Sequence, residues 1–261
     1  MWEKEIKETM ERVTREILSR CIQYSQRKGR DIFISKTSSG RGMNVKELDP
    51  RTPEGRANLE AFFKVPKRHY TIYGLGNPSE KNAVNWRDVN LGWLRRTVNL
   101  LAIFSAMVLK GSPFKIRLYR LLGVHIGQDT EIMMGVWLDH FRPELIFVGD
   151  RTLLGAFTRV TVHAYEGLGK FRFGVVSIGS DCKISTGAAM GMIEIGDHVR
   201  TLPNTVLSPY YFRIPDGAVV GYQKPTCTLA GFDSEAASSK GCGPEERTSA
   251  GSLEERKGEK L

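Results

Sequence analysis

The chain has 261 residues, of which 41% are hydrophobic, and a formal net charge of +9. This length and composition are typical of a protein that buries a sizeable core in one large domain, with or without a smaller appended one. The basic balance favours acidic partners, such as an anionic membrane or a phosphate-rich small molecule. Nucleic acid is not an expected partner, because no zinc-finger or aromatic RNA-binding motif is present.

The spacing of the cysteines and the character of the first residues indicate the cellular compartment. The four cysteines are scattered and form no CxxC pair, which argues against a disulfide framework or a zinc site. The first residues are charged and lack the apolar segment of a signal peptide. We therefore expect a cytoplasmic protein, or one at the inner face of the membrane.

The N-terminal region, residues 1–45, begins with a pattern typical of a helix. Apolar residues recur at helical spacing over residues 1–28, which predicts an amphipathic helix. Residues 29–44 are rich in Gly, Ser and charged side chains, so we expect a linker there.

The next region, residues 46–122, is expected to be helical or irregular. A short helix is predicted within 49–63, where Thr52-Pro53-Glu54 suits a helix start. The sequence YGLGNP at 73–78 predicts a turn. Residues 86–122 have a helical pattern that breaks near 111–113.

An apolar stretch at 98–109 is too short to span a bilayer, which needs about 20 residues. It is flanked by Arg95, Arg96 and Lys110. A helix packed on the core is the favoured interpretation. The alternative is an interfacial helix that contacts the membrane through residues 93–120.

A six-residue repeat begins at Gly123. Inward-type aliphatic residues recur six apart in three separate triplets, and glycine often follows the aliphatic residue. The triplets are Ile126, Ile132 and Leu138; Val148, Leu154 and Val160; and Ile178, Ile184 and Met190.

This repeat predicts a mainly β fold, a parallel β-helix over residues 123–225 preceded by an α-helical N-terminal region. Each triangular coil needs one aliphatic side chain per side and a tight corner that glycine tolerates. One coil cannot bury its own inner face, so coils must stack. We expect residues 46–122 to pack on the first coil. We expect the polar tail, residues 226–261, to be disordered.

The repeat is interrupted around residues 139–144 and again at 164–174. In a solenoid such insertions become loops that project from one face, and loops are where sites are commonly built.

Residues 123–225 resemble the hexapeptide-repeat acyltransferases. The sequences that carry the resemblance are LYRLLGVHIG at 118–127, FVGD at 147–150 with VTVH at 160–163, and IGD at 195–197 with IPDGAVVG at 214–221. The resemblance implies a left-handed β-helix, acetyl-CoA as acyl donor and a homotrimer with sites in the clefts between subunits. It also implies a hydroxyl of a sugar or glycan precursor as acceptor. Residues 202–212 differ, because prolines and aromatic rings replace the small residues that the family presents to CoA.

The candidate catalytic residue is His163, which matches the catalytic histidine of the family. A histidine titrates near neutrality and can take a proton from a hydroxyl as it attacks a thioester. Asp139 and Glu166, one in each insertion, are the candidates to fix its tautomer. The sequence alone favours a His163 that only caps a coil edge, and it is equally compatible with Asp139 and Glu166 as solvated loop acids.

For CoA, the resemblance points to Thr186, Ser208, Arg213 and Lys224 on the late coils. Hydroxyl and basic groups bind phosphates, although residues of these types are common on any surface. No metal is expected as a cofactor.

Two alternatives remain. Carbonic anhydrases with the same β-helix fold bind zinc through three histidines, and His125, His140 and His163 lie on different coils. They lack the close pair of histidines of that family. The second alternative is a β-helix that serves only as an assembly scaffold, and the unusual sequence of residues 202–212 leaves this alternative open.

Overall fold

The computed structural model of the chain describes residues 2–36, 42–64, 73–76, 92–109, 113–167, 170–207 and 213–221. The chain divides into two units, residues 1–221 and residues 222–261. The second unit, which includes the tail that the sequence predicts to be disordered, lies outside the described residues.

The described helices match the expected ones. They are α1 (Glu3–Lys28), α2 (Pro53–Lys64), α4 (Trp93–Val108) and α5 (Pro113–Leu121), with short 3-10 helices η1 (Val45–Leu48) and η2 (Pro143–Leu145). Helix α1 buries the predicted stripe that includes Met10, Val13, Ile17 and Cys21, and it ends at Gly29 in the left-handed conformation. Proline at the first position of α2 confirms its predicted start.

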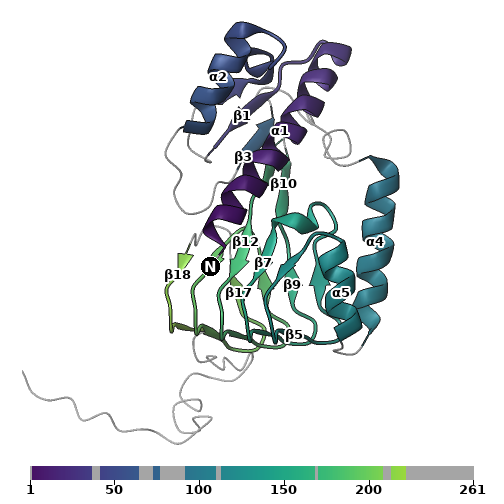
Figure 1. The fold of residues 1–261 in the computed structure, drawn as a ribbon, viewed down its shortest axis with the longest axis vertical. Helices are drawn as coiled ribbons and strands as arrows, with labels where there is room; N and C mark the ends of the chain where they lie inside the picture. Colours follow the sequence, from purple (N-terminus) through teal and green to yellow (C-terminus); the bar gives the residue numbers. More distant parts are fainter. Residues whose placement is uncertain are drawn as a thin grey trace, which may run out of the picture. The chain divides into compact units, whose positions relative to one another are not determined.

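The region from His125 to Val220 forms stacked coils of three short strands (Figure 1). The strands are β4 (His125–Ile126), β5 (Glu131–Ile132), β6 (Trp137–Leu138), β7 (Ile146–Val148), β8 (Leu153–Leu154), β9 (Arg159–Val160), β12 (Val176–Ile178), β13 (Lys183–Ile184), β14 (Ala189–Met190), β15 (Glu194–Ile195), β16 (Arg200–Thr201), β17 (Val206–Leu207), β18 (Arg213–Ile214) and β19 (Val219–Val220). They form three parallel sheets in the orders β18-β15-β12-β7-β4, β19-β16-β13-β8-β5 and β17-β14-β9-β6. This architecture is typical of a left-handed β-helix and confirms the predicted fold.

The six-residue repeat places the expected aliphatic side chains inside the coils. Equivalent residues of successive coils pair directly, for example Leu138 with Val160 and Leu154 with Ile184. All of these side chains are buried, so the stacked coils share one continuous apolar core.

The glycines beside these aliphatic residues have a different role from the expected one. Gly149 does not adopt a positive φ, but a Cβ there would lie 2.5 Å from the carbonyl carbon of Gly179 in the next coil. The left-handed corner falls two residues later, at non-glycine residues such as Arg151 (φ 49°) and Asp181 (φ 57°). Glycine is therefore required for the close approach of neighbouring coils rather than for the turn itself.

Polar side chains bridge the coils along the corner that follows the first sheet. Asp150 accepts a hydrogen bond from the Gln128 N–H at 2.7 Å, and its own N–H donates to Ser180 Oγ at 3.1 Å. Asp197 accepts from the Ser180 N–H at 2.7 Å. These bonds satisfy corner amides that the sheets leave unpaired.

Both insertions leave the β-helix at the same corner, after β6 and after β9. The second forms the hairpin β10 (His163–Gly167) and β11 (Lys170–Phe173), which joins an antiparallel sheet in the order β10-β11-β3-β1-β2. Strands β1 (Phe33–Ser35) and β2 (Met43–Asn44) lie in the stretch expected to be a linker, and β3 (Tyr73–Gly76) lies in the expected turn. In these residues both expectations were wrong, because β3 pairs with β1 and β11, which lie far from it in sequence, and β2 pairs with β1.

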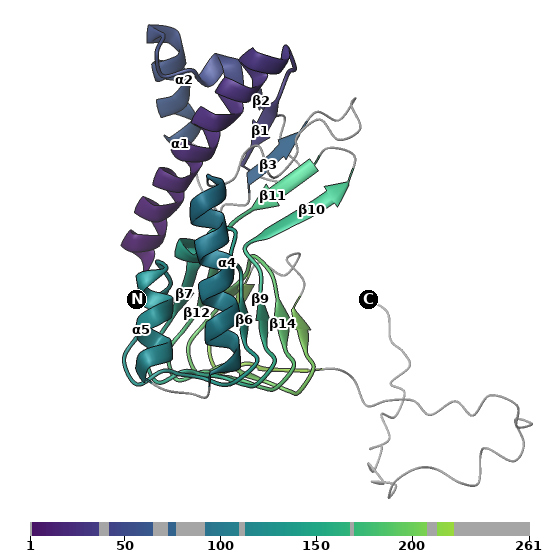
Figure 2. The same ribbon diagram turned by 90° about the vertical axis from the view of Figure 1, so that its right-hand side faces the viewer.

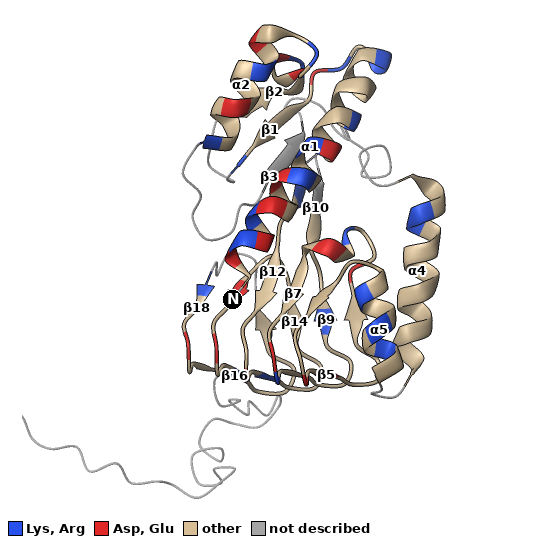
Figure 3. Ribbon diagram, in the orientation of Figure 1, with Lys and Arg blue, Asp and Glu red and all other residues tan. Residues whose placement is uncertain are grey.

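Helices α4 and α5 run along one side of the β-helix (Figure 2). The Gly135 N–H of the first coil donates to the Met107 carbonyl of α4 at 2.8 Å, and α5 contacts β4 and β5. Figure 3 shows both signs of charge along α1, whereas the charged residues of α4 and α5 are all basic. Among the described residues, no helix is long and apolar enough to cross a membrane.

Candidate active site

The corner that carries both insertions brings His163 and Asp139 together. The His163 Nδ1 atom lies 2.6 Å from Asp139 Oδ2. Asp139 directly follows β6, and His163 begins β10 one coil later. Because Leu138 pairs with Val160 across the two coils, residues just beyond each strand emerge side by side.

Backbone amides hold the Asp139 carboxylate in place. Its Oδ1 accepts from the Phe141 N–H at 2.8 Å, and its Oδ2 accepts from the Val162 N–H at 2.8 Å. The side chain is 2% exposed, whereas that of His163 is 28% exposed. Because an ionised carboxylate only accepts hydrogen bonds, the proton of the imidazole belongs on Nδ1. The Nε2 atom is then available to accept a proton.

Two phenylalanine rings fix the orientation of the imidazole. Phe141, from the first insertion, lies 4.8 Å from the His163 ring centroid, and Phe171 of β11 lies 5.8 Å from it. Both phenylalanines are fully buried. Ring packing and the Asp139 hydrogen bond therefore restrict His163 to one position with its edge open to solvent.

Of the other predicted site residues, Thr186 and Arg213 have described side chains, and neither lies beside His163. Glu166 lies within β10, but its side chain is outside the described set, as are Ser208 and Lys224. Thr186 is exposed in the corner between β13 and β14. Arg213 is exposed at the start of β18, on the same corner of the β-helix as His163 but two coils further along.

The three histidines of the zinc alternative do not converge within the chain. The His125 ring stacks on Phe147 at 4.2 Å and contacts Trp2 at 5.8 Å, so it packs beneath the start of α1. The described part of the chain contains no group of three or more His, Cys, Asp or Glu side chains placed to hold a metal ion.

His140 lies close to the His163–Asp139 pair. Burial lowers the pKa of His140, and the nearby His163 and Arg96 act in the same direction, while Asp139 opposes them. The His140 backbone carbonyl accepts a hydrogen bond from Asn99 Nδ2 of α4 at 3.3 Å. Helix α4 is thereby attached to the loop that carries Asp139.

A buried ionic cluster supports the same loop, and no sequence pattern predicts it. Arg142 is fully buried, and its Nη1 lies 2.8 Å from Glu16 Oε2 and 3.3 Å from Glu144 Oε1. An arginine beside a proline in a polar insertion has the pattern of a solvated loop. Only the packing of α1 over η2 makes it a core residue.

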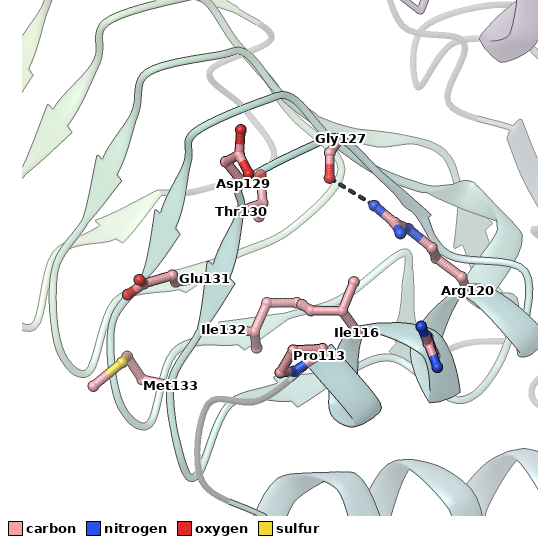
Figure 4. Close-up of a pocket in the computed structure, with 10 residues that line it drawn as sticks. Pro113, Ile116, Arg120, Gly127, Asp129, Thr130, Glu131, Ile132 and Met133 are labelled. Atoms are coloured by element: carbon pink, nitrogen blue, oxygen red, sulfur yellow. Dashed lines mark hydrogen bonds between the residues drawn. The ribbon is translucent and has the colours of Figure 1, made fainter.

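A separate pocket of about 700 Å³ lies between α5 and the first coil (Figure 4). Its lining includes Arg117, Arg120, Asp129 and Glu131, and Arg120 donates to the Gly127 carbonyl at 2.8 Å. The charges of the lining have both signs, and the pocket does not include the His163 corner.

The chain was compared with protein-family models, curated proteins and solved structures. No family model matches the chain. It is 30% identical over 131 residues to the "Putative acetyltransferase YvoF" of Bacillus subtilis (strain 168), a match that covers 49% of this chain and 74% of that protein.

Two solved structures are similar over 49% of this chain and 82% of their own. One is a hexapeptide-repeat-containing acetyltransferase of Vibrio cholerae O1 biovar eltor complexed with acetyl coenzyme A, with 18% identity and a TM-score of 0.39. The other is a maltose O-acetyltransferase of Clostridium difficile 630, with 16% identity and a TM-score of 0.37. The Bacillus relative and the six-residue repeat on three parallel sheets together show that this chain belongs to the hexapeptide-repeat acetyltransferase family.

Proposed function

We propose that the protein transfers an acetyl group from acetyl-CoA to a hydroxyl of a sugar or glycan precursor, with His163 as the general base. The observation that carries this proposal is the hydrogen bond of 2.6 Å between His163 Nδ1 and the buried Asp139 carboxylate. An imidazole fixed in this tautomer, with its other nitrogen toward solvent, is suited to accept a proton from an alcohol.

The reaction needs no covalent enzyme intermediate. His163 Nε2 takes the proton of the acceptor hydroxyl as its oxygen attacks the thioester carbonyl carbon. The carbon–sulfur bond then breaks, and the imidazolium returns the proton to the CoA sulfur. Asp139 stabilises the imidazolium between the two proton transfers because its negative charge lies beside Nδ1.

The acetyl donor and the trimer are linked in this proposal. His163 and Thr186 lie on different corners of one β-helix, so a single chain does not bring them to one cleft. In a trimer, the Thr186 corner of one subunit can face the His163 corner of its neighbour. Arg213, exposed on the His163 corner, supplies a cation suited to the phosphates of CoA. The acetyl-CoA named for the Vibrio structure supports the choice of donor.

The proposed acceptor site lies on the side of His163 opposite the proposed acetyl-CoA site, beside the β10–β11 hairpin. This hairpin pairs with β3 of the N-terminal region, so the wall next to the imidazole is built from parts of the chain far apart in sequence. The maltose acetyltransferase among the similar structures supports a sugar hydroxyl as the acceptor class.

Donor binding tests this proposal without knowledge of the acceptor. We expect acetyl-CoA to raise the thermal unfolding midpoint, because ligand at 100 times its Kd stabilises a native state by about 2.7 kcal/mol. The Arg213→Ala variant should show a smaller shift, and light scattering should give the mass of a trimer. CoA release should then be measured across a panel of mono- and disaccharides. An unchanged midpoint at saturating acetyl-CoA contradicts the proposal and favours the scaffold alternative.

A further inference from the structure

Helix α4 exposes an apolar face to solvent. Asn99, Ile103 and Ala106 are buried along one side of the helix. Large apolar side chains occupy the opposite side, with exposed fractions between 38% and 72%. These side chains belong to Trp93, Leu94, Val98, Leu100, Leu101, Phe104 and Val108. Single exposed hydrophobic residues are common on protein surfaces, whereas a contiguous apolar face of this kind marks an interaction surface.

The two hydroxyl residues on this face are satisfied within the helix. Thr97 Oγ1 donates to the Trp93 carbonyl at 2.9 Å, and Ser105 Oγ donates to the Leu101 carbonyl at 2.8 Å. Both hydroxyls can therefore enter an apolar environment without the loss of a hydrogen bond. The face is apolar along four turns of helix, despite two polar residues in its sequence.

The charged residues of the segment that carries this face have one sign. Residues 89–128 contain six Lys or Arg residues and no Asp or Glu. In Figure 3 the charged residues of α4 and α5 are all basic. Helix α5 also exposes the apolar side chains of Phe114 and Leu121. Arg95 on α4 and Arg117 on α5 are both exposed. An apolar face with basic residues beside it is complementary to a membrane with anionic headgroups.

We propose that α4 docks on an anionic phospholipid membrane, parallel to its surface, with the apolar face in the interfacial region. A helix of 16 residues is about 24 Å long, which is short of the length that spans a bilayer. Docking of this face against the same face of a second copy is disfavoured, because the charged residues of α4 and α5 are all basic and would meet residues of the same sign.

Docking through α4 brings the candidate active site to the membrane surface. Asn99, on the buried side of the helix, donates to the His140 carbonyl next to Asp139. An acceptor held in the membrane, such as a lipid-linked glycan, then lies within reach of His163. This consequence rests on the proposed function, whereas the docking itself does not.

Vesicle sedimentation tests the docking with the full chain. Sucrose-loaded vesicles of phosphatidylcholine alone are compared with vesicles containing about one third phosphatidylglycerol, because anionic lipid supplies the electrostatic attraction. We expect the protein to sediment with the anionic vesicles and to be released by high salt. The double variant Leu101→Ser, Phe104→Ser should bind at least tenfold more weakly. The matched control Val206→Ser, Val219→Ser removes exposed valines from strands of the β-helix and should bind like the unmodified protein.

Three results would overturn the docking proposal. The first is failure of the unmodified protein to sediment with anionic vesicles. The second is binding by the Leu101→Ser, Phe104→Ser variant equal to that of the unmodified protein. The third is a native mass of that variant, without lipid, lower than that of the unmodified protein. The last result would make the face a contact between subunits. Acetyl-CoA binding by the same variant, followed through the thermal midpoint, should be unchanged, so failure of the docking and failure of the proposed function are distinguishable.

Discussion

Arg142 of the first insertion and Glu16 of α1 are joined by a hydrogen bond of 2.8 Å between Nη1 and Oε2, across 126 positions of sequence. Burial raises the pKa of Glu16, but the hydrogen bond and charge of Arg142 outweigh this and lower it overall. The bond attaches the loop of Asp139 to the N-terminal helix, so the position of the candidate site depends on a contact outside the β-helix.

Removal of this buried guanidinium should destabilise the fold. In the Arg142→Met variant the carboxylate of Glu144, which is 3% exposed, loses its described cationic partner. A buried charge without a partner costs about 3–5 kcal/mol in the free energy of unfolding, which urea denaturation measures. The control Arg151→Met removes the exposed pair with Asp181 and should have a small effect. Equal losses in both variants would contradict the role given to Arg142.

The stacked glycines provide a second test. Gly149→Ala places a methyl group 2.5 Å from the carbonyl carbon of Gly179, so the coils must separate. We expect a loss of about 1–3 kcal/mol or more in the free energy of unfolding, as for other overpacked sites. Gly92→Ala, where a Cβ meets nothing within 4 Å, is the matched control. A Gly149→Ala protein as stable as this control would show that the coils are not in close contact.

The pH dependence of stability should follow the half-buried histidines, of which His125 is one. Burial lowers the pKa of His125; the charge of Glu5 opposes this shift and that of Arg12 adds to it. In the unfolded chain the His125 imidazole takes up a proton near pH 6.5, whereas in the folded chain it does so only at lower pH. The contribution of His125 to the free energy of unfolding is therefore fully present above this pH and is lost as the pH falls below it.

His125→Phe keeps a ring on Phe147 and removes the titrating group. Between pH 7.5 and pH 5.5, this variant should lose less unfolding free energy than the unmodified protein. His198→Asn, which replaces an exposed imidazole at a left-handed corner, is the control. Identical losses in the unmodified protein and His125→Phe would exclude His125 as a source of acid sensitivity.

Asp139→Asn tests the orientation of the imidazole. An amide in this position can donate to Nδ1 and move the imidazole proton to Nε2, which then cannot act as a base. We expect kcat to fall on the order of 10²-fold, with little change in the KM for acetyl-CoA. Far-UV circular dichroism checks that the fold is retained. A normal kcat in a folded Asp139→Asn protein would remove Asp139 from the mechanism.

The sequence predicted the β-helix because each coil repeats one simple requirement, an inward aliphatic residue every six positions. The same periodicity places Asp139 and His163 just beyond equivalent strands, which predicts that they lie close together. The spacing determines where the chain leaves the coil, and two insertions at one corner must emerge side by side.

The antiparallel sheet could not be predicted in the same way. Strand β3 contains two glycines in four residues, and β1 and β2 contribute three and two residues each. Such segments have little intrinsic propensity to form strands. They are strands because of pairing between them, in which Leu75 pairs with both Ile34 and Phe171. Arg142 was missed for a related reason, since its burial depends on α1, which lies far away in sequence.

The most direct test of the mechanism is the rate of acetyl transfer by His163→Ala at saturating acetyl-CoA. We predict that kcat falls by about 10²- to 10⁴-fold, the contribution of a general base, while acetyl-CoA still raises the thermal midpoint as in the unmodified protein. Transfer at the unmodified rate by a folded His163→Ala protein would contradict the account.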